Sequence, residues 1–168
     1  MKSLLAAVIP LLLLNSCVFE SPFETSAKIP TDEKLLGRWE EVPDKPDAQS
    51  DTKPDRMLVL QHSANEYVVE YPVGAKAMFF RAFAVQLEGK PYIQIQLLGT
   101  AEGPAKPEDR KYHLLKVAVD GDKVEMRTLD AAVLGKNPGD TAGMKAAFAL
   151  HKDDPNLFGE VVKFRRVK

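Results

Sequence analysis

Short runs of strand-forming residues separated by turn signals are the feature that most constrains this fold. In residues 93–97, large aliphatic side chains alternate with glutamine. This period of two is expected of a strand with one buried face. Glu-Gly-Lys at 88–90 and Asp-Gly-Asp at 120–122 are tight-turn signals, because glycine adopts a positive φ at little cost. The alternation and the turns together predict antiparallel hairpins.

The whole chain after residue 30 continues this pattern. Apolar residues at i, i+3, i+4 and i+7 interrupt it once and predict one helix, from about Asp140 to His151. Many short strands fit a sandwich or a barrel, and a barrel leaves no unpaired edge. We therefore expect a mainly β fold, an antiparallel up-and-down barrel of about eight strands with one helix before the last strand. The expected strands are 34–40, 56–62, 66–71, 76–88, 92–97, 110–119, 123–129 and 160–167.

The N-terminus has a different composition. Lys2 precedes an apolar run over residues 3–14, which is shorter than the roughly 20 residues of a membrane-spanning helix and is typical of a signal peptide. Cys17 is the only cysteine, and it follows Leu14, Asn15 and Ser16. This stretch resembles the lipobox of bacterial lipoproteins. The resemblance implies cleavage before Cys17, a thioether-linked diacylglycerol on its sulfur and acylation of the new amino group.

The lipobox resemblance also implies a domain organisation and a location. We expect a signal peptide at 1–16, a flexible tether at 17–30 that begins at lipidated Cys17, and a barrel domain at 31–168. Val18 follows the cysteine where an aspartate would mark retention in the inner membrane, so the resemblance favours the outer membrane, facing the periplasm. The alternative is an ordinary signal peptide with an incidental cysteine.

A second resemblance lies at the start of the barrel domain. Gly37-Arg38-Trp39 is similar to the G-x-W signature of lipocalins, and the helix before the last strand is also lipocalin-like. In that family an arginine near the C-terminus packs over the tryptophan. Arg165 or Arg166 matches it, and Arg165 is the first candidate. The resemblance implies that Trp39 closes one end of the barrel and has a structural role.

A lipocalin-like barrel implies a cavity for a small hydrophobic ligand. The candidate lining residues come from the aromatic run at 76–88 and from the following strand: Phe79, Arg81, Phe83, Tyr92 and Gln94. One interpretation is that Arg81 holds the carboxylate of a fatty acid, and the other is core packing with Arg81 reaching the rim. We expect a membrane-anchored lipoprotein that binds such a ligand. The alternative is an envelope-structural or protein-interaction lipoprotein without a ligand.

Several classes of function find no support in the sequence. The chain has 23 Lys and Arg against 24 Asp and Glu, a net charge of −1, so it has no broad attraction for nucleic acid. Neither serine of the domain lies in G-x-S-x-G, and the three histidines lack metal-ligand spacing. We therefore expect no catalysis, metal or cofactor. The basic run at 163–168 is either a solvated strand face or a contact with anionic lipid or a partner.

Overall fold

The computed structural model describes residues 18–43, 53–135 and 138–167. These residues form nine strands, two α-helices and two short 3-10 helices. The strands are β1 (Gly37–Val42), β2 (Arg56–Ser63), β3 (Glu66–Tyr71), β4 (Met78–Leu87), β5 (Lys90–Thr100), β6 (Gly103–Pro104), β7 (Tyr112–Asp120), β8 (Lys123–Thr128) and β9 (Val162–Arg166). The helices are η2 (Glu33–Leu35), η3 (Pro107–Asp109), α1 (Ala131–Leu134) and α2 (Thr141–His151).

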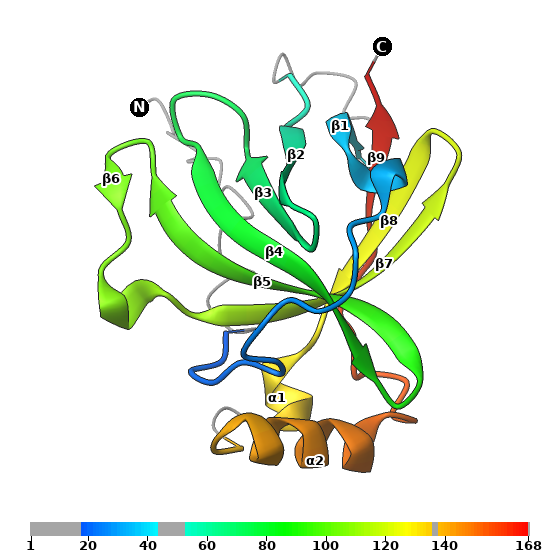
Figure 1. Ribbon diagram of the computed structural model, residues 1–168. Helices are drawn as coiled ribbons and strands as arrows, with labels where there is room; N and C mark the ends of the chain where they lie inside the picture. The colour runs from blue at the N-terminus through cyan, green and yellow to red at the C-terminus, as the bar shows by residue number, and fades with distance from the viewer. Residues whose placement is uncertain (1–17, 44–52, 136–137, 168) are drawn as a thin grey trace, which may run out of the picture.

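Eight of the strands close into an antiparallel barrel. Each strand pairs with its neighbour in the order β1, β2, β3, β4, β5, β7, β8, β9, and β9 returns to pair with β1 (Figure 1). The short strand β6 adds to the end of β5. The expected up-and-down barrel and the helix before the last strand are confirmed. The sequence did not predict β6 and η3, which lie within the region expected to be a loop.

The strand register places side chains on two sides of the barrel wall. Tyr67 pairs with Ala82, which pairs with Ile95, so these three side chains point the same way. They belong to an apolar cluster with Trp39 inside the barrel. The side chains between them point outward, where a second cluster lies beneath α1, α2 and the N-terminal segment. The wall of this barrel is therefore apolar on both sides.

The N-terminal segment packs on the outside of the wall. Phe19 and Phe23 are 0% exposed, and their rings meet edge to face with centroids 5.7 Å apart. Phe19 and Tyr112 exchange two backbone hydrogen bonds, each of 2.9 Å. The expectation of a flexible tether up to residue 30 was therefore wrong from Val18 onward, because two buried aromatic side chains hold the segment down. Cys17 and the expected signal peptide lie outside the described residues.

The closed end of the barrel is built around Trp39. Its indole nitrogen donates to the Leu35 carbonyl at 2.9 Å, which joins the tryptophan to η2. The Arg166 guanidinium lies over the ring, 4.1 Å from its centroid. Gly37 has a φ of +119°, and a Cβ atom there would lie 2.9 Å from the Arg166 guanidinium. The backbone conformation therefore requires glycine, and a Cβ atom would also displace the end of the Arg166 side chain.

Arg166, and not the first candidate Arg165, occupies the place over the tryptophan. The two residues are neighbours on β9, so their side chains point to opposite faces of the sheet. Arg166 pairs with Trp39, whereas Arg165 pairs with Glu40. The Arg165 side chain is 63% exposed and lies 3.7 Å from the Glu40 carboxylate. It therefore belongs to the solvated outer face.

Candidate functional site

The interior of the barrel is the first candidate for a binding site. Its walls come from every strand of the closed barrel, and most of its lining side chains are aliphatic or aromatic. At the closed end, Tyr67 is 2% exposed and its hydroxyl meets the backbone of Asp32. Burial raises the pKa of the Tyr67 phenol above its ordinary value. The Tyr67 hydroxyl is thus paired with the backbone of the residue that caps η2.

Several inward-pointing side chains of the barrel are not fully buried. Those of Val69, Ile93, Ile95 and Val117 point inward and are only half-buried. In a close-packed core, aliphatic side chains at the centre lose nearly all contact with water. The outward-pointing Leu114, which the N-terminal segment covers, is 0% exposed. The interior therefore keeps more accessible apolar surface than the covered part of the outer wall.

A polar pair lies inside the barrel, where Glu41 follows Trp39 by two residues on the same face of β1. The Tyr71 hydroxyl donates to the Glu41 carboxylate at 2.7 Å, and the Tyr71 ring meets Phe164 edge to face at 5.8 Å. Burial, together with this hydrogen bond, raises the pKa of the Tyr71 phenol far above its ordinary value. Glu41 and Tyr71 form the hydrogen-bonding feature of an otherwise largely apolar surface.

The sequence did not single out Glu41 and Tyr71. The available signal was the alternation of Tyr67, Val69 and Tyr71 in one strand, which places the two tyrosines on the same face. This alternation does not indicate whether that face points into the barrel. The partner Glu41 lies on β1, which is separated from β3 by β2, so the contact depends on the register of these three strands.

The five residues predicted to line a cavity lie together, but on the outer wall. Phe83 pairs with Gln94, and Arg81 lies two residues before Phe83 on the same face of β4. Tyr92 lies on this face of β5, and Phe79 pairs with Glu70 on the outer face of β3. The inward direction expected for Phe79, Phe83 and Tyr92 was wrong. The reason is that the N-terminal segment and α2 cover an outer face as apolar as the inner one.

Each of these outward residues has an identified neighbour. Tyr92 and Phe83 belong to the outer cluster with Phe148 of α2, whose ring centroid is 5.2 Å from that of Tyr92. Arg81 forms an ion pair with Glu66 and lies 5.0 Å from the Phe83 ring centroid. The hydrogen bond from Arg81 lowers the pKa of the Glu66 carboxyl. This guanidinium is therefore engaged on the outer wall and does not face the interior.

Gln94 is a structural residue of the outer wall. Its side chain is 1% exposed and accepts from the backbone amides of Phe23 and Glu24 at 2.6 and 3.0 Å. Its own amide nitrogen donates to the Glu24 carbonyl at 2.9 Å. One glutamine thereby satisfies three backbone groups of the N-terminal segment. Its polar character serves this docking and not a ligand cavity.

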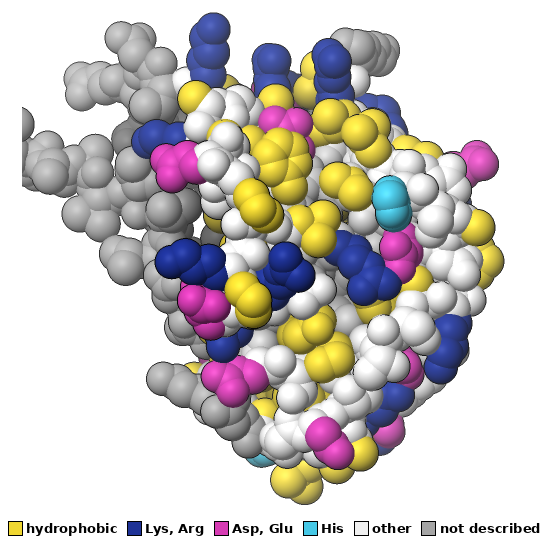
Figure 2. Space-filling view, turned by 60° about the vertical axis from the view of Figure 1, so that its left-hand side comes forward, with side chains coloured by type: hydrophobic (Ala, Val, Ile, Leu, Met, Phe, Trp, Pro, Cys, Tyr) yellow, Lys and Arg dark blue, Asp and Glu magenta, His cyan; other side chains and the backbone are white. Residues whose placement is uncertain are grey.

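Part of the outer wall carries exposed apolar side chains. Figure 2 shows apolar side chains scattered among charged ones on one such face. Leu60 is 51% exposed and pairs with Val68 on β3, and Leu98 is 38% exposed. Within the described ranges, α1, α2 and the segment with Phe19 and Phe23 pack against the outer cluster and not against these leucines. This uncovered wall is a second candidate site, for contact with another macromolecule.

The described ranges also bear on metal binding and on membrane spanning. Within them, no group of three or more His, Cys, Asp or Glu side chains has the geometry to hold a metal ion. His113 is buried and points into the barrel, opposite Ile95. No helix in the described part of the chain has both the length and the apolar character to cross a bilayer.

Comparison with known proteins returned no match to a family model, a curated protein or a solved structure.

Proposed function

We propose that this protein is a lipid-anchored envelope protein whose barrel holds a small hydrophobic molecule. The observation that carries the proposal is the half-buried state of the inward-pointing aliphatic side chains, among them Ile93, Ile95 and Val117. Apolar surface left in contact with water inside a concave site favours an apolar ligand by about 25 cal/mol per Å² buried. The barrel interior has this surface and the polar pair of Glu41 and Tyr71.

The polar pair suggests how such a ligand lies. The Glu41 carboxylate lies two residues beyond Trp39 on the same face of β1, and it accepts a hydrogen bond from the Tyr71 hydroxyl. A ligand with an apolar body and a hydrogen-bond donor at one end matches this arrangement. Its body would lie against the aliphatic side chains, and its donor would meet Glu41. A fatty acid carboxylate is the poorer match, since it would face another carboxylate.

The binding proposal is tested by filling the interior from one strand. Val68 and Val69 are neighbours on β3 and are both half-buried, but only Val69 points into the barrel. Every contact described above lies within residues 18–167, so a chain that begins at Val18 retains them all. The neutral dye N-phenyl-1-naphthylamine, which fluoresces in apolar surroundings, serves as the ligand. Val69→Trp is the test variant, and Val68→Trp is the matched control.

We expect the unsubstituted chain and Val68→Trp to bind the dye with similar affinity. We expect Val69→Trp to bind it about tenfold more weakly, since a loss of roughly 55 Å² of apolar contact corresponds to that factor. Equal affinity in all three chains, or no binding by the unsubstituted chain, would refute a ligand site in the interior.

The anchoring part of the proposal concerns Cys17 and has its own test. Cys17→Ala removes the sulfur that would carry the diacylglycerol, so the protein should leave the membrane fraction or retain its leader. Cell fractionation and the mass of the purified protein report the two outcomes. An unchanged mass and an unchanged membrane fraction in the variant would show that Cys17 is not lipidated. In that case an ordinary signal peptide is the better interpretation, and the binding proposal is unaffected.

A second candidate function is contact with a protein partner in the envelope. The observation that favours it is the uncovered outer wall, where Leu60 is 51% exposed. Leu60→Glu places a charge among the exposed apolar side chains, at a position where a charged side chain can reach water. If the wall binds a protein, cross-linking in intact cells should yield a product that this variant loses and that Val69→Trp retains.

A further inference from the structure

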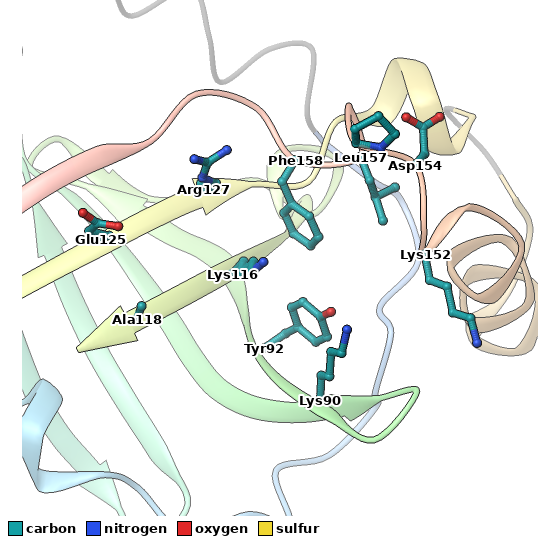
Figure 3. A pocket seen from close by; sticks show the side chains of 11 residues that line it. Lys90, Tyr92, Lys116, Ala118, Glu125, Arg127, Lys152, Asp154, Leu157 and Phe158 are labelled. Carbon is teal, nitrogen blue, oxygen red and sulfur yellow. The ribbon is translucent and has the colours of Figure 1, made fainter. Parts of the chain in front are cut away.

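A pocket on the outer wall of the barrel has a charge unlike that of the chain as a whole. Its volume is about 500 Å³, and it lies between the strands β5, β7 and β8 and the turn after α2. It opens on the outer face of the barrel wall. Figure 3 shows the aromatic side chains of Tyr92 and Phe158 in the middle of the pocket and charged side chains around them.

The pocket has an aromatic floor that is held in place. The rings of Tyr92 and Phe158 are stacked, with centroids 5.6 Å apart and planes within 2°. Phe148 of α2 meets both rings edge to face, at 5.2 and 6.5 Å. Phe158 also forms an isolated bridge with Leu129. These contacts fix the rings before any ligand arrives, which lowers the entropic cost of binding against them.

Four cationic side chains surround this floor, against two carboxylates. The cations are Lys90, Lys116, Arg127 and Lys152. Of these, Lys152 is held by Glu88 at 2.8 Å, whereas the described residues provide no ion pair for the other three. The chain as a whole has a net charge of −1. The pocket is therefore a local concentration of positive charge on a nearly neutral protein.

The two carboxylates of the pocket do not neutralise these cations. The Asp154 carboxylate accepts from the backbone amide of Asn156 at 2.8 Å, which ties it to the turn after α2. Glu125 lies two residues from Arg127 on β8 and pairs across the ladder with Ala118. Figure 3 shows the Glu125 side chain at the far side of Arg127 from the aromatic floor. An anion between the cations and the rings would thus approach the cations without meeting a carboxylate first.

Lys116 and Arg127 form the centre of the positive charge. They stand directly opposite each other in the β7–β8 ladder, and both are exposed. Like charges at directly opposed positions destabilise a β-ladder. An anionic group placed between them removes this repulsion and gains charge-assisted hydrogen bonds, which the arginine fork makes in pairs. A phosphate monoester fits best, because its charge of about −1.5 to −2 at pH 7 matches two cations.

We propose that this pocket binds a phosphate ester, with the phosphate between Lys116 and Arg127 and the organic part against the Tyr92 and Phe158 rings. The pocket is too large for inorganic phosphate alone, and the fixed rings offer a flat apolar surface to the rest of the ligand. The phosphate group can belong to a soluble ester or to the headgroup of a membrane lipid. The proposal does not depend on a ligand in the barrel interior.

Phenyl phosphate is a suitable probe because it combines a phosphate monoester with one aromatic ring. The full-length protein is reconstituted into nanodiscs of phosphatidylcholine, and binding is measured by ligand-observed NMR. The test variant is Lys116→Gln with Arg127→Gln. The matched control is Lys123→Gln, another exposed cation on β8 that does not line the pocket. Tryptophan fluorescence and the urea unfolding midpoint establish that each variant is folded.

We expect the unsubstituted protein to bind phenyl phosphate more tightly than inorganic phosphate. The double variant should lose about tenfold in affinity for each cation removed, and Lys123→Gln should change the affinity by less than about twofold. No binding at about 10 mM probe, or an equal loss in Lys123→Gln, would overturn the proposal. Should the double variant fail to fold, Lys116→Gln and Arg127→Gln tested singly provide the same comparison.

A second set of nanodiscs distinguishes the source of the phosphate. Phosphatidic acid carries a phosphate monoester, and phosphatidylglycerol at matched surface charge does not. If the headgroup of a lipid occupies the pocket, phenyl phosphate should bind more weakly in phosphatidic acid nanodiscs than in phosphatidylglycerol nanodiscs. Equal binding in the two supports a soluble ester. In either result, loss of binding in the double variant still supports the pocket.

Discussion

Replacing Gln94 with leucine should loosen the N-terminal segment from the barrel wall. The substitution keeps the approximate size of a side chain that is 1% exposed, but it removes both hydrogen-bonding groups. The backbone amides of Phe23 and Glu24 and the carbonyl of Glu24 then lose their partner. Since these groups lie at the buried side of the segment, water replaces the glutamine only if the segment lifts away.

The magnitude follows from the three hydrogen bonds. A buried polar group that loses its partner costs about 1–3 kcal/mol. Three such groups, two of them only partly buried, would cost about 4 kcal/mol, and the apolar gain of the leucine offsets about 1 kcal/mol. We therefore expect the free energy of unfolding to fall by about 3 kcal/mol. Full release of the segment would also expose the rings of Phe19 and Phe23, which are now 0% exposed.

The same strand provides a matched control. Gln96 points to the same outer face, but its side chain donates only to the Arg110 carbonyl, at 3.1 Å in an exposed position. Gln96→Leu should change the free energy of unfolding by less than about 0.5 kcal/mol. Urea unfolding followed by the fluorescence of Trp39, the only tryptophan, measures both variants. Equal effects of the two substitutions would refute a special role of Gln94 in docking the segment.

Two further predictions concern the inside of the barrel. Arg166→Gln should lower the free energy of unfolding by about 2–3 kcal/mol, because the guanidinium lies over Trp39 and donates to two backbone carbonyls. Arg165→Gln, at a 63% exposed side chain, should lower it by less than about 0.5 kcal/mol in the same urea assay. Equal losses in the two variants would contradict the placement of Arg166 over Trp39. Burial and the hydrogen bond to Glu41 raise the pKa of the Tyr71 phenol. Above about pH 10 the unfolded chain therefore loses a proton that the folded chain retains. The free energy of unfolding should then fall by up to about 1.4 kcal/mol per pH unit. Tyr71→Phe should make this decline shallower by that amount, and an unchanged slope between about pH 9 and 11 would show that Tyr71 titrates normally.

The fold was predictable because short stretches of the sequence specify its strands and turns. The alternation at 93–97 and the glycine turns at 89 and 121 each fix a strand or a hairpin from a few neighbouring residues. Closure between β1 and β9 follows, since a meander of this length leaves two edges that pair with each other. The helix before the last strand was signalled by its own period and by the Asp140 cap.

The direction of the strand faces was not predictable in the same way. Phe83, Tyr92 and Gln94 form one face, as the alternation indicated. Which face points inward depends on what covers the other one, and here Phe19 and Phe23 return from the N-terminus to do so. The residues around them, rich in serine, proline and glutamate, resemble a linker in composition. Two aromatic residues within such a stretch were the signal for docking.

The choice between Arg165 and Arg166 likewise depends on which face of the strand points inward. The sequence places both residues within a final strand, and only the ladder with β1 shows which of them lies beside Trp39. The outer pocket could not be predicted from the sequence for a similar reason. Lys116 and Arg127 become opposite neighbours through the register of the β7–β8 hairpin, whereas Phe158 arrives from a turn about 30 residues later.

The docked N-terminal segment would limit how far the barrel can lie from a lipid on Cys17. Only two peptide units separate Cys17 from Phe19, which span at most about 7 Å. A lipid on Cys17 would therefore hold Phe19, and the strand β7 that it pairs with, close to the membrane surface. If the segment were released as far as Pro30, the same connection would extend to about 45 Å. Release of Phe19 and Phe23 from the wall would thus let the barrel move several times farther from its anchor than the docked segment allows.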